Sequence, residues 1–157
     1  QRENICSILD DTLELLTSHL LKSHIELHRT YPKMLLLFID RNQLKQAFLN
    51  IFLNSIQAMP NGGKLYVSLE MAGTSNVIIS IRDTGAGIPK EELPHIFDPF
   101  HTTKEAGTGL GLSIVHGIIE KHGGEIKVES EVGRGTTISV ILKNRSSYTP
   151  ASKAFPS

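Results

Sequence analysis

The sequence predicts an α+β fold, a two-layer sandwich in which one mixed, mostly antiparallel sheet carries helices on one face. Segments that alternate between apolar and polar residues come in pairs, and a short turn containing glycine joins each pair, which is typical of antiparallel hairpins. Segments with apolar residues at helical spacing lie between these pairs. Because every helix has to bury one apolar stripe, layering the helices on one sheet face is the natural solution.

The first element is an amphipathic helix over residues 3–22, which has apolar residues at helical spacing and polar residues between them. Residues 25–31 roughly alternate, and residues 35–39 form a short apolar run after Pro32. Both of these segments are therefore predicted to be strands.

The next helix begins after Asp40, which resembles an N-cap with Gln43 as the reciprocal side chain of a capping box. It runs to about Ala58 and stops before Pro60. Its predicted buried positions are Leu44, Phe48, Ile51, Phe52 and Ile56.

Two hairpins complete the sheet. Residues 64–71 and 77–83 alternate cleanly around a turn and predict the first hairpin. A helix starting at about Leu110 ends at basic residues followed by glycine, which is a common C-cap. Residues 125–130 and 136–143 predict the second hairpin.

Composition limits the function classes. The 157 residues suit one domain, and Lys+Arg equals Asp+Glu at 16 each, so charge gives no argument for nucleic acid or an anionic membrane. Cys6 is the single cysteine, which excludes an internal disulfide and fits a reducing compartment. The chain begins with Gln1 rather than methionine, so we expect a fragment, a cytoplasmic domain whose parent protein can be membrane-anchored.

A glycine-rich segment precedes the last predicted helix and suggests a phosphate site. Residues 107–111 read GTGLG, and Lys104 lies just upstream. The free N–H groups at a helix start attract anions, and glycine lets a ligand approach the backbone closely. The spacing fits neither a dinucleotide GxGxxG motif nor a P-loop. The alternative is a flexible loop before an ordinary core helix.

Two further segments carry polar groups suited to a nucleotide. Asn50 and Asn54 lie four residues apart on one helix face, and an amide oxygen is a hard ligand that suits Mg²⁺; the alternative is a solvated face. Asp83 follows a strand and opens the sequence DTGAGIP, where its carboxylate can accept from an exocyclic amine. The alternative for this segment is an ordinary Asp-x-Gly turn.

Taken in order, these segments resemble the ATP-binding catalytic domain of bacterial sensor histidine kinases. That domain belongs to the GHKL superfamily, with gyrases, mismatch-repair ATPases and heat-shock chaperone ATPases. The segments are NxxxNSIQA, DTGAGIP, IFDPF, GTGLGLSIV and GxGTT, and the sequence NSIQAMPNGG looks most like the nitrogen-regulation and sporulation branch. The resemblance implies a catalytic domain over residues 24–143. Residues 1–23 would then be a linker helix or the end of an upstream dimerisation module, and residues 144–157 a disordered tail.

The resemblance also implies roles for residues that bind Mg²⁺ and ATP. Asp83 would accept from the adenine amine, with Gly87 and Thr137 completing the base pocket, and Asn54 would ligate Mg²⁺. The other implied ATP contacts are Gly85, Ile88, Phe97, Phe100, Thr103, Gly107, Thr108, Gly109, Leu110, Gly111 and Leu112.

Asn50 and Lys104 are the residues that the resemblance implies for the transfer step. Asn50 would support the phosphate side, and Lys104 would reach the terminal phosphate. The superfamily's hydrolases carry a glutamate at the position of Asn50, where it activates water. An amide cannot accept that proton, so histidine phosphotransfer is favoured over ATP hydrolysis. A serine kinase of the anti-sigma type, an ATPase and a passive ATP-binding domain stay open as alternatives.

None of the seven histidines is followed by Glu or Asp, as a phosphoacceptor histidine of these kinases typically is. We therefore expect the acceptor on an upstream dimerisation domain outside this fragment. The expected partners are that domain and, for the full-length protein, a response regulator, with no nucleic acid. The fragment itself is expected to be a monomer.

Overall fold

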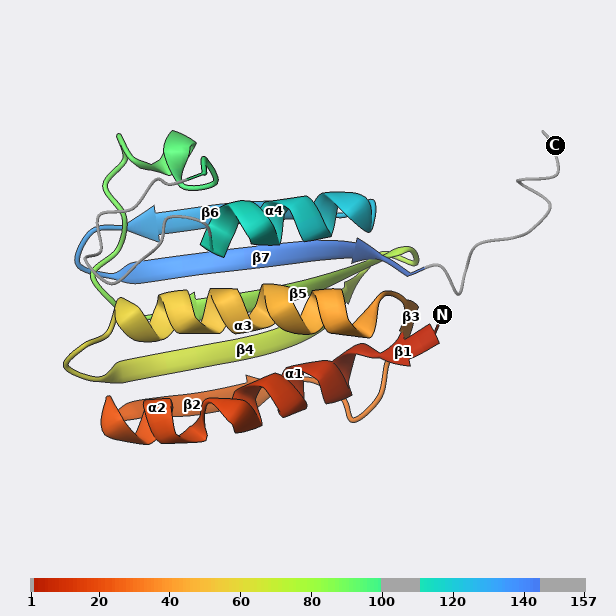
Figure 1. The fold of residues 1–157 in the computed structure, drawn as a ribbon, viewed down its shortest axis with the longest axis horizontal. Coiled ribbons are helices and arrows are strands. Elements are labelled where there is room, and N and C mark those ends of the chain that lie inside the picture. Colours follow the sequence, from red (N-terminus) through yellow and green to blue (C-terminus); the bar gives the residue numbers. More distant parts are fainter. Residues whose placement is uncertain (1, 100–110, 145–157) are drawn as a thin grey trace, which may run out of the picture.

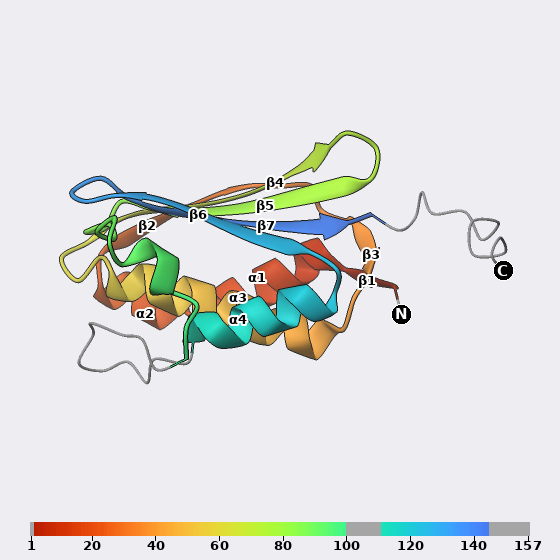
Figure 2. The same cartoon turned by 90° about the horizontal axis from the view of Figure 1, so that it is seen from above.

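The computed structural model describes residues 2–99 and 111–144 and shows two layers. A five-stranded sheet forms one layer, and the helices α1 to α4 all lie on one of its faces (Figures 1 and 2). This arrangement confirms the predicted two-layer α+β sandwich. None of the helices in residues 2–99 and 111–144 combines the length and apolar character that a membrane span needs.

The main sheet has the strand order β2-β4-β5-β7-β6. The pair β2 and β4 is parallel, whereas the other three pairs are antiparallel, so the sheet is mixed and mostly antiparallel. Both predicted hairpins are confirmed, β4 with β5 and β6 with β7. The strands are β2 (Ile25–Thr30), β4 (Gly63–Ala72), β5 (Asn76–Asp83), β6 (Glu125–Glu131) and β7 (Gly135–Lys143).

The helix predicted over residues 3–22 is divided into two. Helix α1 (Ile5–Leu15) ends at Leu16, and α2 (Thr17–Lys22) follows directly. The hydroxyl of Thr17 donates to the carbonyl of Glu14 at 2.9 Å, a local bond that competes with the helical ladder. The other helices are α3 (Arg41–Gln57), the short 3₁₀ helix η1 (Leu93–His95) and α4 (Gly111–Lys121).

A small second sheet differs from the prediction. Strand β3 (Leu36–Phe38) was expected from its apolar run, but it pairs with β1 (Arg2–Asn4) instead of joining the main sheet. Asn4 stabilises this ribbon, because its side-chain oxygen accepts from the amides of Cys6 at 3.1 Å and Leu35 at 3.0 Å. The same oxygen therefore caps α1 and fixes the entry to β3.

Helix α1 belongs to the main hydrophobic core. Ile5, Ile8 and Leu9 have no exposed surface, and α1 packs against α3. The segment predicted as a linker or upstream-module helix thus shares one core with the rest of the domain. The division of a longer protein at residue 23 stays a prediction.

Candidate functional site

The sequence-predicted site residues of the described chain gather at one end of the sheet. Helix α3 and strand β5 finish there, and strand β7 and helix α4 begin there (Figure 1). Chain order alone does not show this, because the segments are far apart in the sequence, with Asn50 and Thr136 separated by 86 positions. The fold therefore brings helix α3 with Asn50 and Asn54, the DTGAGIP loop and the start of α4 to a common edge.

The centre of this edge is a row of side chains in register across four strands. Leu65 of β4 lies opposite Asp83 of β5, which lies opposite Thr136 of β7, which lies opposite Ser130 of β6. We call Asp83, Thr136 and Ser130 the polar rung. Directly opposed residues point to the same sheet face, and fully buried Leu65 marks this face as the one under the helices.

Asp83 is the buried acid of the rung. It is 4% exposed and Thr136 is 6% exposed, so both are polar side chains inside the protein. The Oδ1 atom of Asp83 accepts from the amide of Gly85 at 2.9 Å and from the amide of Thr136 at 3.3 Å. These bonds compensate part of the desolvation cost and hold the carboxylate in one orientation.

The loop after Asp83 is pressed against the end of α3. A Cβ atom added at Gly85 would lie 2.4 Å from the carbonyl oxygen of Ala58, so only glycine fits there. The amide of Ala86 donates to the same carbonyl at 3.2 Å. The loop thus supplies one of the bonds that the end of α3 needs.

The other side of the loop rests on the turn between β6 and β7. Gly87 has φ +81°, and a Cβ atom there would lie 2.3 Å from the carbonyl oxygen of Glu131. The amide of Gly133 donates to the carbonyl of Ala86 at 2.8 Å. Ile88 continues the contact, because its amide donates to the Ser130 hydroxyl at 2.7 Å.

Asn54 lies one helical turn before the contact between α3 and the loop. Its carbonyl accepts from the amide of Ala58 at 3.1 Å, and Ala58 is the residue that Gly85 touches. Asn50 lies one further turn back, and both asparagines are half-buried. Among the described residues no group of three His, Cys, Asp or Glu side chains could hold a metal ion. Amide oxygens such as those of Asn50 and Asn54 are among the hard ligands that suit Mg²⁺.

Phe97 joins the chain after the loop to helix α4. Its ring lies 5.4 Å from the ring of His116, measured between centroids. Gly111 begins α4, and no atom of the described residues lies within 4 Å of where a Cβ atom would stand. Leu112 packs at the edge of the core. The predicted contacts Phe100, Thr103, Lys104, Gly107, Thr108, Gly109 and Leu110 lie outside the described residues.

The structure places Thr136, and not the predicted Thr137, on the sheet face that carries Asp83. Thr137 lies opposite Arg82 and Glu129, so its side chain faces the other side of the sheet from Asp83. Thr136 is the threonine beside Asp83. The dipeptide TT alone does not choose between them, but the alternation along β7 does. Thr136 is in phase with Ile138, Val140 and Leu142, which are buried as Asp83 is.

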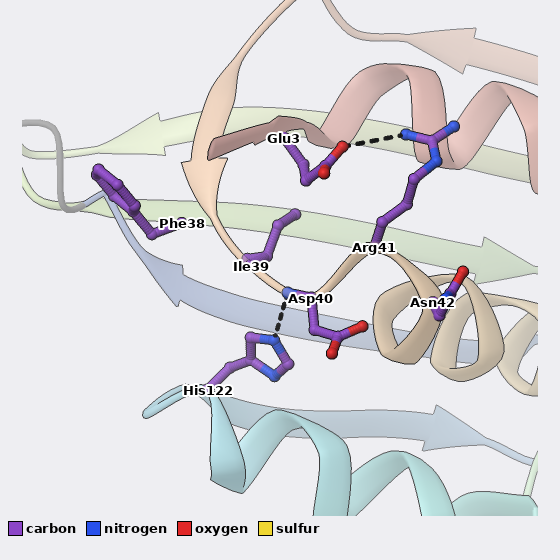
Figure 3. A pocket seen from close by; sticks show the side chains of 7 residues that line it. All are labelled: Glu3, Phe38, Ile39, Asp40, Arg41, Asn42 and His122. Carbon is purple, nitrogen blue, oxygen red and sulfur yellow. Dashed lines mark hydrogen bonds and ion pairs between the residues drawn. The ribbon is translucent and has the colours of Figure 1, made fainter. Parts of the chain in front are cut away.

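A pocket lined by described residues lies at the opposite end of α3, away from the sequence-predicted site (Figure 3). Its volume is about 570 Å³. Asp40 caps α3 as predicted, because its side chain accepts from the amide of Gln43 at 3.0 Å. The Asp40 amide, which a capping box would give to Gln43, instead donates to Nε2 of His122 at 3.1 Å. The start of α3 is therefore fastened to the end of α4. The lining residues are Glu3, Phe38, Ile39, Asp40, Arg41, Asn42 and His122.

Comparisons with known proteins agree with this geometry. Residues 39–146 match the family described as histidine kinase-, DNA gyrase B-, and HSP90-like ATPase. Sporulation kinase E of Bacillus subtilis (strain 168) is 38% identical over 146 residues, which are 92% of this chain and 20% of that protein. The chain spans about a fifth to a third of the length of the curated relatives it matches first.

Solved structures show the same fold. The nucleotide-free catalytic domain of histidine kinase ThkA superposes with a TM-score of 0.83 at 31% identity, covering 92% of this chain and 97% of that one. Full-length ShkA, solved in complex with AMPPNP, has a TM-score of 0.79 at 25% identity and covers 90% of this chain and 30% of its own.

Proposed function

The chain belongs to the family of histidine kinase-, DNA gyrase B- and HSP90-like ATPases, and on this premise we propose that it is the Mg-ATP-binding catalytic domain of a sensor histidine kinase. In this proposal it transfers the γ-phosphate of ATP to a histidine on another domain of its parent. The observation that carries the proposal is the buried carboxylate of Asp83, held at the sheet end beside a glycine-bounded loop.

The adenine base would bind against the polar rung. A fixed, buried carboxylate at the mouth of a glycine loop favours a planar ligand with a hydrogen-bond donor, and the adenine amine is such a donor. Guanine carries an oxo group at that position, and two facing acceptors would leave buried groups unpaired. The pocket would consist of Asp83, Thr136 and the loop from Gly85 to Ile88.

The phosphates would lie between α3 and the start of α4. Asn54 would hold Mg²⁺ through its amide oxygen, with Asn50 supporting the phosphate side. When bound, Mg²⁺ neutralises charge on the phosphates. The N–H groups at the start of α4, around Gly111, would attract the negative phosphates, and Lys104 would reach the terminal one.

The choice of kinase over hydrolase depends on Asn50. A hydrolase needs a base close to the attacking water, whereas an amide side chain does not accept a proton near neutral pH. Phosphoryl transfer needs mainly positioning and charge neutralisation, and the nucleophile can be an imidazole that another domain brings. The relatives named as sporulation and sensor histidine kinases support this reading.

The proposal includes partners and boundaries. We place the phosphoacceptor histidine on an upstream dimerisation domain and the final phosphate acceptor on a response regulator. We place the domain in the cytoplasm, where ATP is available. Because α1 is part of the core, the folded catalytic unit would include β1 and α1 and not start at residue 24.

The experiment is a phosphotransfer assay with the purified domain and radiolabelled ATP. The domain alone should hydrolyse ATP negligibly and should not label itself. Adding the dimerisation domain of the parent should produce a phosphorylated histidine, which is stable to alkali and labile to acid. Rapid ATP turnover by the domain alone would favour the ATPase, and phosphoserine on an added partner would favour a serine kinase.

A further inference from the structure

The hydroxyl of Ser130 connects the three parts of the candidate base pocket. It accepts from the amide of Ile88 at 2.7 Å, donates to the carbonyl of Gly135 at 3.0 Å, and lies 2.8 Å from the hydroxyl of Thr136. One side chain on β6 thus holds the end of the DTGAGIP loop, the start of β7 and the buried threonine of the polar rung.

Counting protons fixes the direction of these bonds. Ser130 has one proton, and the carbonyl of Gly135 can only accept, so that proton goes to Gly135. The amide of Ile88 can only donate. The contact with Thr136 is then a hydrogen bond only if Thr136 donates to Ser130. Every other assignment places two acceptors against each other.

The consequence concerns the hydrogen-bonding character of the rung. Because the hydroxyl proton of Thr136 is used in the bond to Ser130, Oγ1 of Thr136 can only accept further hydrogen bonds. The Thr136 side chain is then a hydrogen-bond acceptor, as the Asp83 carboxylate is. The two residues are neighbours, because the Thr136 amide donates to Oδ1 of Asp83 at 3.3 Å. Two neighbouring acceptors select a ligand that brings N–H donors and disfavour one that brings a carbonyl.

We propose that Ser130 is a positioning residue that turns Thr136 into an acceptor and thereby strengthens the preference for an amine-bearing base over an oxo-bearing one. This inference rests on the proposed function, since it assumes that Asp83 and Thr136 contact the base of ATP. Ser130 does not touch the nucleotide in this proposal. It acts through Thr136 and through the loop at Ile88.

The test measures ATP and GTP affinity by calorimetry for the wild type and for Ser130→Ala. We expect ATP affinity to fall about tenfold, because the variant leaves the Ile88 amide unpaired. GTP affinity should fall less, because the freed Thr136 hydroxyl can turn and donate to an oxo group. The ratio of ATP to GTP affinity should therefore decrease. Ser130→Thr keeps the hydroxyl and should restore the wild-type ratio.

Two further variants separate positioning from general destabilisation. Val140→Ala opens a cavity under β7, where Val140 is fully buried, and should lower stability without changing the ratio. Thr136→Val removes the acceptor itself and should lower the ratio, which also provides a test if Ser130→Ala fails to fold. A wild-type ratio in Ser130→Ala or in Thr136→Val overturns the inference alone. A wild type that binds no ATP overturns the proposed function and this inference with it.

Discussion

At the scale of single residues, two glycines with similar backbone angles carry different constraints. Gly87 has φ +81° and Gly133 has φ +86°, so an alanine is strained at either position. A Cβ atom at Gly87 would also collide with the backbone of Glu131, whereas nothing within 4 Å opposes one at Gly133. Alanine substitutions at these two glycines therefore separate the effect of backbone strain from the effect of a steric collision with the β6–β7 turn.

We predict that Gly87→Ala lowers ATP affinity at least about tenfold. The collision displaces the loop that would contact the base, and leaving buried groups unpaired costs on the order of 1–3 kcal/mol. Gly133→Ala is the matched control and should change affinity little, since it adds strain of about 1 kcal/mol without a collision. Calorimetry on both variants checks this. Equal losses in the two variants would show that the fit of Gly87 against Glu131 has no part in binding.

Asn54 tests the metal assignment. Asn54→Ala should reduce the gain in ATP affinity that Mg²⁺ gives by roughly ten- to a hundredfold, because the variant removes a proposed ligand. Gln46→Ala changes an exposed amide on the same helix and should keep the full gain. ATP titrations in the presence of Mg²⁺ and in the presence of a chelator measure this gain for each variant. An undiminished Mg²⁺ effect in Asn54→Ala would place the cation elsewhere.

The position of Asp83 at the end of a strand could be predicted from a single segment of the sequence, whereas its role in binding stays a prediction. Asp83 was chosen because it ends a strand and opens a glycine loop, and the structure places it buried at that position. The structure places Thr136, and not Thr137, on the face of Asp83, and the alternation of Thr136 with the buried residues Ile138 and Val140 along β7 is the signal that indicates it. Side-chain direction in a strand reverses with every residue, so a one-residue uncertainty changes the face.

At the scale of elements, polar clusters fasten α1 to both layers. Asp10 of α1 accepts from the hydroxyl of Tyr31 at 2.5 Å and from the guanidinium of Arg29 at 3.1 Å. Asp11 of α1 pairs with Arg41 at the start of α3. Helix α1 is therefore held to β2 and its outgoing chain on one side and to α3 on the other.

Burial, reinforced by the hydrogen bond to Asp10, raises the pKa of Tyr31 well above its ordinary value of 10.0. The folded state therefore holds this proton more tightly than the unfolded state. Its stabilising contribution is complete below the unfolded pKa and is lost as the pH rises above it.

We accordingly expect the free energy of unfolding to fall as the pH rises above about 10, and to fall less steeply in Tyr31→Phe. Burial and the nearby Asp10 carboxylate also raise the pKa of Cys6, so part of the slope should persist in that variant. Denaturant titrations across this range measure both slopes. An equal dependence of the free energy of unfolding on pH in the wild type and in Tyr31→Phe would contradict the link between Tyr31 ionisation and stability.

Element prediction worked where periodicity or capping is visible over several residues. The two hairpins and α3 with its Asp40 cap follow from alternation and from N-cap chemistry. Strand β1 and its pairing with β3 were not predicted, because three residues are too few to show a period. The break at Leu16 was missed because the apolar stripe continues across it, with Leu16 and Leu20 both buried.

At the scale of the whole molecule, the two ends of the helical layer differ in character. At one end, α3 finishes against the loop after β5, where the polar rung lies. At the other end, Asp40 and His122 join the start of α3 to the end of α4 (Figure 3). The described residues proposed to bind ATP therefore lie at the end of the helical layer opposite the Asp40–His122 hydrogen bond.

The central claim is that this edge binds ATP through its base. The most direct measurement is calorimetry with ATP and GTP on the wild type, on Asp83→Asn and on Glu70→Gln. Glu70 is an exposed carboxylate on the other face of the sheet and serves as the control. The account predicts that the wild type and Glu70→Gln prefer ATP by at least about tenfold, in line with a penalty on the order of 1–3 kcal/mol, and that Asp83→Asn loses most of this preference. Equal affinity of the wild type for ATP and GTP, or an unchanged preference in Asp83→Asn, would contradict it.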